Sequence, residues 1–159
     1  MNFLNNPQFQ IFIQLILATL LGGIVGLERE YKRRAAGLRT YSLVSLGAAL
    51  FTILGLKAAE MYIDSNNSSL GIDPSRIIGQ IVLGIGFLGA GLIIIRESRV
   101  EGLTTAAGLW VVAAVGAAVG VKLYSIAFFA AFLTLGILSV LRIVEEKFIH
   151  KSQPGDTEI

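Results

Sequence analysis

The chain has 159 residues, of which 54% are hydrophobic and only 15% are charged, and its formal net charge is +2. An average soluble domain carries roughly 25% charged residues. The absence of cysteine excludes disulfides, zinc–thiolate sites and thiol nucleophiles, and the single histidine, His150, argues against a Ser-His-Asp triad. A soluble domain of this size cannot bury so much apolar surface, so the composition predicts a membrane protein.

Five apolar stretches are each long enough to cross a bilayer as a helix. A helix needs roughly 20 residues to cross the hydrocarbon layer, whereas buried strands are far shorter. Lipid also requires every backbone polar group to be paired, which helices achieve within one segment. The stretches cover residues 9–27, 41–63, 77–95, 103–121 and 123–141. We therefore predict an all-α, polytopic membrane protein with about five transmembrane helices in a domain over 1–141, followed by a short tail over 142–159.

The distribution of basic residues predicts the orientation. Ten of the thirteen Lys and Arg residues fall in the first loop, the third loop and the C-terminal tail. Because basic loops stay on the cytoplasmic side, we predict the N-terminus outside and the tail in the cytoplasm. Lys122 alone separates the last two spans, which predicts a tight turn at 120–123. The first span lacks a preceding basic residue and a small-residue cleavage pattern, so we expect a retained helix.

A short repeat is present within the chain. Residues 34–40 and 99–105 both fit R-x-x-G-L-x-T, and eight of the 24 positions in 26–49 are identical to those 65 residues later. This pattern predicts a parallel repeat of two helix hairpins, formed by spans one and two and by spans three and four, plus one extra helix. Shared composition is the alternative. In both copies Gly-Leu-x-Thr enters an outward helix, so Thr40 and Thr105 are candidates to cap that helix or to bond a neighbour.

Glu28 is the first candidate for a functional residue. It ends the first span, where a charge near hydrocarbon is costly and normally has a partner. We expect Arg39 to be that partner, with Arg29 second. In one interpretation, this pair responds to cations or protons at the cytoplasmic end of the bundle, and Glu28 is then the best metal-ligand candidate. In the other, it is a structural ion pair. The adjacent basic run, residues 32–34, is expected to attract anionic lipid headgroups.

Span three carries a polar outer half. Arg76, Gln80 and Gly84 recur at helical spacing on one face. They would line an outer vestibule, or else Arg76 reaches the headgroups while Gln80 bonds a neighbouring helix. The formal dinucleotide motif G-x-G-x-x-G at 84–89 lies in the middle of this span, without the preceding strand that such a site needs, so we reject it.

Glycine is abundant, with 18 residues, and many of them lie inside the spans. In membranes, glycines let helices approach closely, either within a chain or between subunits. The candidates for such helix packing are Gly22, Gly26, Gly84, Gly86, Gly89, Gly91, Gly116 and Gly120. Trp110 lies inside span four, away from the interfacial aromatic belt, and we expect it to pack in the core.

Five motifs occur in order along the chain: G-L-E-R-E (26–30), A-G-L-R-T (36–40), L-G-A-A-L-F (46–51), Q-I-V-L-G-I-G-F-L-G-A-G (80–91) and G-L-T-T-A-A-G-L-W (102–110). Together they resemble the MgtC/SapB family of bacterial inner-membrane proteins, over residues 12–121. The fifth span matches only generically. Matched to the family's motifs, the residues expected to matter are Glu28, Arg29, Gly37, Arg39, Thr40, Gln80, Thr104 and Thr105.

The resemblance implies a function that the residues alone do not specify. The family is linked to growth at low magnesium and, in pathogens, to survival within host cells. The resemblance implies a non-enzymatic regulator in the bacterial inner membrane that modulates other membrane proteins, among them ATP synthase and cation ATPases. Direct magnesium transport by an oligomer is the alternative. Longer members append a soluble cytoplasmic domain, which we do not expect after this short tail.

The residues themselves favour a protein without catalytic chemistry. The sequence contains no convincing nucleophile–base pair, metal-ligand cluster or phosphate-binding loop. We therefore expect no catalytic residues and no cofactor. Magnesium binding stays open. The expected partners are the lipid bilayer and other membrane proteins, with a homo-oligomer left open and no nucleic acid. Against transport, the middles of four spans carry no ionisable residue, whereas magnesium prefers carboxylates and water.

Overall fold

The computed structural model describes residues 6–66, 73, 75–96, 99–144 and 147. Its long helices are α1 (Pro7–Tyr31), α2 (Leu38–Asn66), α3 (Ser75–Leu92), α4 (Leu103–Gly120) and α5 (Tyr124–Gly136). A π-helical turn, η2 (Ile137–Leu141), and a short α6 (Arg142–Val144) continue α5, while β1 (Ile94–Arg96) and β2 (Arg99–Glu101) form a hairpin between α3 and α4. Five helical stretches are long and apolar enough to span a membrane, which confirms the predicted fold class. Residues 67–72 of the second loop and most of the predicted tail, with His150, lie outside the described residues.

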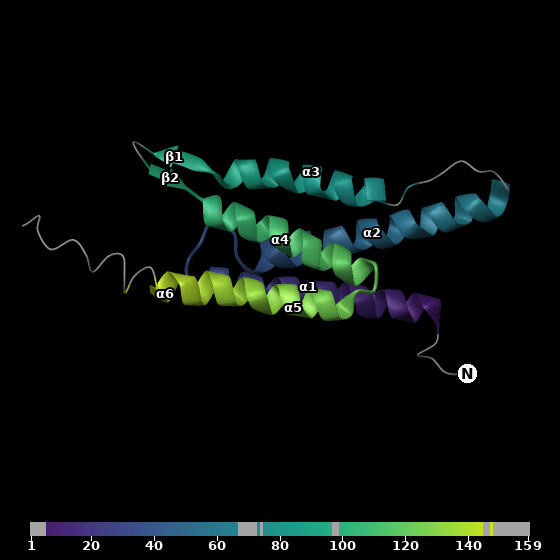
Figure 1. Ribbon diagram of the computed structural model, residues 1–159, viewed down its shortest axis with the longest axis horizontal. Coiled ribbons are helices and arrows are strands. Elements are labelled where there is room, and N and C mark those ends of the chain that lie inside the picture. Colours follow the sequence, from purple (N-terminus) through teal and green to yellow (C-terminus); the bar gives the residue numbers. More distant parts are fainter. Residues whose placement is uncertain (1–5, 67–72, 74, 97–98, 145–146, 148–159) are drawn as a thin grey trace, which may run out of the picture.

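Helix α4 forms the centre of the bundle and contacts each of the other four long helices. In Figure 1 it lies between α3 on one side and α1 and α5 on the other. In α4, 56% of the residues are buried, compared with 11% in α3. Because most of the side chains that α4 buries are alanine, glycine or valine, its neighbours can approach closely. Trp110 falls on the exposed stripe of α4 with Ala107 and Ala114, so it is 51% exposed instead of packing in the core as expected.

Glycines bring α1, α2 and α4 together around Ser45 of α2. A Cβ atom on Gly22 of α1 would lie 2.5 Å from the Ser45 Cβ, and one on Gly116 of α4 would overlap the Ser45 backbone. Gly26 and Gly120 lie similarly close to other residues of α2. Ser45 is therefore fully buried between two neighbouring helices. This three-helix contact fixes the positions of the loops that form the candidate site.

The glycines of α3 pack differently. Gly84, Gly86 and Gly91 have no atom of another described part of the chain within 4 Å of the position where a Cβ would lie. Gly89 approaches α4, with the Ala106 Cβ 3.6 Å away. Within the described chain, the expected close helix approach therefore does not occur at three of the four α3 glycines predicted to make it, because α3 meets α4 with one face and leaves the rest exposed.

The main departure from the predicted spans is the hairpin after α3. The sequence predicts that span three continues to residue 95, but α3 ends at Leu92. Residues 94–96 then pair with 99–101 as antiparallel strands. The β-branched side chains in both strands favour this extended pairing. The tight turn predicted at 120–123 is present between α4 and α5.

The two predicted repeat copies also differ in their loops. The first loop, 32–37, contains no strand, and its backbone turns at Arg33, whose φ is 52°. The second copy turns at Gly102, whose φ is 90° and where a side chain would overlap a backbone carbonyl. Gly37, the aligned glycine of the first copy, has no such φ and lies against the carboxylate of Glu30. The shared motif thus forms two different local structures.

Candidate functional site

A cavity of about 800 Å³ lies at the hairpin end of the bundle, between the end of α1, the first turn of α4 and η2. Its polar lining consists of Arg29, Arg33, Arg34, Glu101, Thr104 and Thr105. Apolar residues of η2 and of the hairpin complete the lining, among them Ile94, Val100, Ile137, Leu138 and Leu141. We refer to it as the basic cavity. It brings together three of the predicted site residues from two segments that are distant in sequence.

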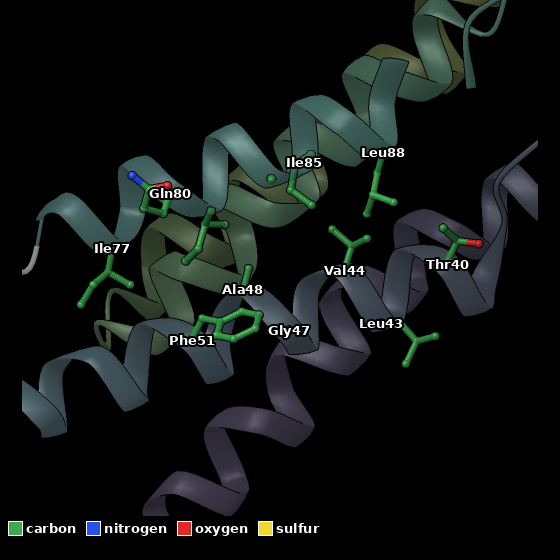
Figure 2. Close-up of a pocket in the computed structure, with 12 residues that line it drawn as sticks. Thr40, Leu43, Val44, Gly47, Ala48, Phe51, Ile77, Gln80, Ile85 and Leu88 are labelled. Atoms are coloured by element: carbon green, nitrogen blue, oxygen red, sulfur yellow. The ribbon is translucent and has the colours of Figure 1, made fainter. Parts of the chain in front are cut away.

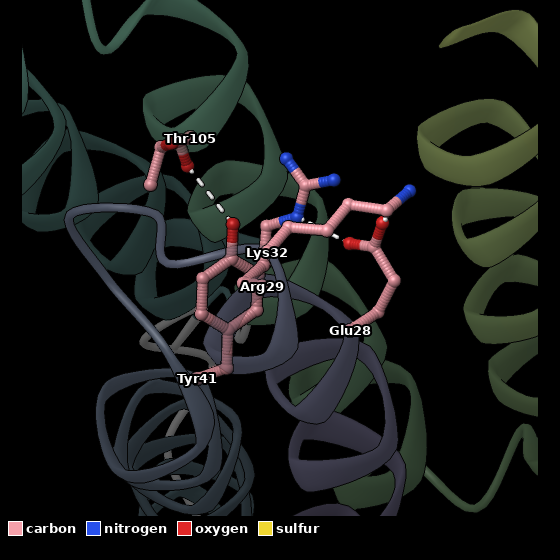
Figure 3. Close-up of polar contacts among 5 residues, drawn as sticks. All are labelled: Glu28, Arg29, Lys32, Tyr41 and Thr105. Atoms are coloured by element: carbon pink, nitrogen blue, oxygen red, sulfur yellow. Dashed lines mark hydrogen bonds and ion pairs between the residues drawn. The ribbon is translucent and has the colours of Figure 1, made fainter. Parts of the chain in front are cut away.

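Glu28 is held by two cationic side chains from the end of its own helix. Arg29 donates from Nε to Glu28 Oε2, and the Lys32 Nζ lies 2.6 Å from Oε1 (Figure 3). Lys32 reaches the carboxylate because α1 continues past residue 27, and residues i and i+4 share one face of a helix. The side chains of Arg29 and Glu28 are 3% and 12% exposed. Arg39, expected as the first partner, lies exposed on α2, so the structure corrects this pairing.

The pairing does not favour Glu28 as a magnesium ligand. Both of its carboxylate oxygens face a cationic side chain, so a metal ion would have to displace Arg29 or Lys32. The arginines of the adjacent basic cavity would also repel a divalent cation. In the part of the chain that the structure describes, no three His, Cys, Asp or Glu side chains form a group that could hold a metal ion.

Sequence reasoning missed Tyr41, which links α2 to α4. Its side chain is fully buried, and its hydroxyl donates to the Thr105 backbone carbonyl over 3.1 Å (Figure 3). Gly108 provides the space, because a Cβ there would overlap the Tyr41 hydroxyl. The only hint in the sequence is that a tyrosine directly follows A-G-L-R-T. This position does not identify a partner on a distant helix.

Replacing Tyr41 with phenylalanine is expected to lower the free energy of unfolding by about 0.5–1.5 kcal/mol, the usual net contribution of one hydrogen bond. The ring keeps its position, but the buried Thr105 carbonyl loses its bond to the tyrosine hydroxyl. Thermal unfolding of the purified protein in detergent measures the change. Tyr124→Phe, at a side chain that is 37% exposed, is the matched control and should leave the midpoint unchanged. Equal shifts in the two variants would contradict the assigned bond.

The two threonines of the repeat do not occupy capping positions. Thr105 is the third residue of α4, which is preceded by Gly102, a residue without a side chain. Thr40 is likewise the third residue of α2. The first turn of α4, which lines the basic cavity, therefore has no side-chain cap, and Thr104 is an exposed residue of that lining.

A second cavity, of about 650 Å³, lies between α2 and α3 (Figure 2). Thr40 of α2 and Gln80 of α3 are its two polar residues. The remaining lining is apolar: Leu43, Val44, Gly47, Ala48, Phe51, Ile77, Ile81, Gly84, Ile85 and Leu88. We refer to it as the apolar groove. The predicted site residues that line a cavity therefore fall into two separate places, Arg39 lines neither of them, and the predicted residues do not form one site.

Comparison with known proteins identifies relatives over most of the chain. A model of the MgtC family matches residues 15–147. The protein named "Putative magnesium transporter YhiD" from Escherichia coli K12 is 38% identical over 143 residues, covering 90% of this chain and 66% of that protein. Protein MgtC of Brucella abortus (strain 2308) is 45% identical over 125 residues, covering 79% and 48%. Protein SrpB of Synechococcus elongatus is 38% identical over 151 residues, covering 87% and 80%.

These matches cover only part of some relatives. The chain spans about two thirds of the length of YhiD and about half of Brucella MgtC. No solved structure matches the chain. The family match includes every residue that lines the basic cavity and the apolar groove. This membrane protein therefore belongs to the MgtC family.

Proposed function

We propose that the chain is a non-enzymatic regulator in the bacterial inner membrane, which supports adaptation to low magnesium by binding other membrane proteins. The observation that carries this proposal is the apolar groove, whose walls belong to the membrane-spanning parts of α2 and α3. Helix α3 packs mainly on α4, and only 11% of its residues are buried, so the groove is open to a further helix. The relatives named MgtC and "Putative magnesium transporter YhiD" support the biological context.

The groove has the properties of a surface for a transmembrane helix of another protein. Gly47 and Gly84, one on each wall, carry no side chain and allow a partner backbone to come close. Gln80 offers an amide group, which in lipid gains by bonding to a partner helix. The other lining side chains are apolar and suit a partner that is itself embedded in the bilayer.

We further assign the basic cavity to the cytoplasmic side of the inner membrane. Residues of the first loop and of the β1–β2 hairpin line the same cavity, so two of the basic segments lie at one end of the bundle. Basic loops are retained in the cytoplasm, which supports an outside N-terminus and a cytoplasmic tail.

Site-specific photocrosslinking in cells tests docking in the groove. A photoreactive phenylalanine analogue at Leu88 of α3 is expected to capture the same membrane protein as one at Phe51 of α2, because both side chains line the groove. The matched control is Phe129 of α5, which is 69% exposed but lies outside the groove. Capture of that protein at Phe129 as well, or no capture from the groove, would contradict the proposed docking.

Filling the groove connects docking to function. Gly84→Leu directs a side chain into open space within the groove, so we expect normal folding, loss of the crosslink and slower growth at limiting magnesium. The matched control is Gly79→Leu, which lies on the same helix but outside the groove. The new Cβ also has no described neighbour within 4 Å, so cells that carry this variant should grow normally. Normal growth of Gly84→Leu at an unchanged protein level would overturn the proposed role.

Magnesium transport by an oligomer is the second candidate, and the name of the E. coli K12 relative favours it. The paired Glu28 carboxylate and the arginines of the basic cavity argue against magnesium passing at that end of one chain. A magnesium-sensitive dye enclosed in proteoliposomes discriminates between the two candidates. Flux above that of empty liposomes under an imposed gradient would favour transport, whereas its absence together with groove crosslinks would favour regulation.

A further inference from the structure

We propose that the basic cavity binds a phosphoryl group, carried either by an anionic lipid headgroup or by a soluble phosphate ester. The first support is its charge. Three arginines and one glutamate line the cavity, which leaves the lining with a net charge of +2. Glu28 does not remove this excess, because Lys32 supplies a matching positive charge on its other oxygen. A dianionic phosphate monoester would neutralise the lining, and a monoanionic phosphodiester headgroup would neutralise half of its charge.

Arg29 provides a fixed donor for such a group. Its side chain is 3% exposed, and the bond from Nε to Glu28 holds the guanidinium in one orientation. Among the described residues, its two terminal nitrogens form no hydrogen bond, and Figure 3 shows them directed away from the Glu28 carboxylate. Two free N–H groups on one edge of a guanidinium match two oxygens of a phosphoryl group. Because Arg29 lines the cavity, an anionic ligand held there can accept from both N–H groups of this edge.

The first turn of α4 provides a second set of donors in the same cavity. Gly102 precedes the helix in a left-handed conformation and offers no side chain to cap it. The start of a helix carries a partial positive charge and unpaired N–H groups, which together favour bound anions. The Thr104 hydroxyl lies in the lining beside them. Donors from α1, the first loop and α4 therefore surround one space.

The size and the apolar wall indicate that the ligand carries more than phosphate. A volume of about 800 Å³ is far larger than a phosphate ion and lies within the range of small-molecule sites, about 300–1,000 Å³. Leu138 and Leu141 of η2 form part of an apolar wall next to the arginines. A phosphate ester with an organic part satisfies both surfaces. The headgroup of an anionic phospholipid and a soluble ester share this chemistry.

Ligand-dependent unfolding of the purified full chain in neutral detergent tests the proposal. The two probes are glycerol 3-phosphate, a soluble ester, and short-chain dioctanoyl phosphatidylglycerol, an anionic lipid. A ligand that binds the folded state raises the unfolding midpoint as its concentration exceeds the dissociation constant. We expect a concentration-dependent rise with at least one probe and none with glycerol or dioctanoyl phosphatidylcholine at the same ionic strength. A rise with the lipid alone assigns a headgroup, and a rise with glycerol 3-phosphate alone assigns a soluble ester.

Charge-neutral variants locate the binding. Arg33 and Arg34 are exposed, so the double variant Arg33→Gln, Arg34→Gln should fold normally and bind about tenfold more weakly, the expected result of losing charge-assisted hydrogen bonds. The matched control is Arg39→Gln, an exposed arginine outside the lining, which should bind as the unchanged chain does. No rise with either probe, or the same loss of binding in Arg39→Gln, would overturn the proposal.

Discussion

Replacing Gly116 with alanine is expected to destabilise the bundle by about 1–3 kcal/mol, the usual cost of adding volume to a well-packed core. The new Cβ would overlap the backbone carbonyl of Ser45, and the Ser45 Cα would lie 2.9 Å from it. Backbone atoms cannot rotate away as a flexible side chain can, so α4 must move from α2. Gly22 packs on the same serine, so the displacement also disturbs the contact with α1.

Gly86→Ala is the matched control for this prediction. The same change on α3 meets no atom within 4 Å, and alanine is a better helix former than glycine, so we expect no loss of stability. Unfolding of both variants in mixed micelles of increasing SDS content measures the difference. An unchanged Gly116→Ala variant would contradict the three-helix contact. Destabilisation at Gly86 instead would show that α3 uses this glycine in contact with another chain.

The sequence predicts the parts of this fold that depend on hydropathy along the chain. Uncharged runs of sufficient length must form helices in a bilayer, and five helical spans are present. The hairpin after α3 was not predictable in this way. Residues 93–95 are three isoleucines that extend the apolar run of 77–92, and hydropathy does not separate the end of a helix from an apolar strand. Strand pairing with 99–101 decides the outcome, and pairing is a tertiary property.

The same limit applies to the glycines. The runs 22–26, 84–89 and 116–120 look alike in sequence, since each places glycines at spacings typical of helix contacts. The structure packs the first and third runs closely against α2, while most of the second run faces open space. Which glycine is in contact depends on which helix faces meet, and spacing within one helix carries no information on that.

The candidate site was predicted in part. A carboxylate at the end of an apolar span indicates a paired charge, and Glu28 is paired. The partner depends on where α1 ends, because a longer helix places Lys32 on the face of Glu28 and leaves Arg39 apart. Tyr41 and Gln14 were missed. Each is a buried polar group that donates to a backbone carbonyl of α4, with the Gln14 bond at 3.0 Å, and a single sequence does not reveal such long-range bonds.

Replacing Glu28 with glutamine is expected to have the largest effect on stability, a loss of about 3 kcal/mol or more in the free energy of unfolding. The change leaves the guanidinium of Arg29, which is 3% exposed, without its counter-charge. A charge taken out of water is stable only when a paired group replaces the lost hydration. Thermal unfolding in detergent measures the loss, and circular dichroism at low temperature reports whether the variant folds.

A second ion pair in the chain distinguishes the effect of burial on stability from the effect of ion pairing itself. Lys57 and Glu60 also lie 2.6 Å apart, but their side chains are 53% and 62% exposed, so Glu60→Gln should cost less than about 1 kcal/mol. The double variant Glu28→Gln, Arg29→Gln removes both members of the buried pair and should regain part of the stability lost by Glu28→Gln alone. Equal losses at Glu28 and Glu60, or a double variant less stable than Glu28→Gln, would contradict the assignment. If the recovered double variant still fails at limiting magnesium, the Glu28–Arg29 pair acts in function and not only in folding.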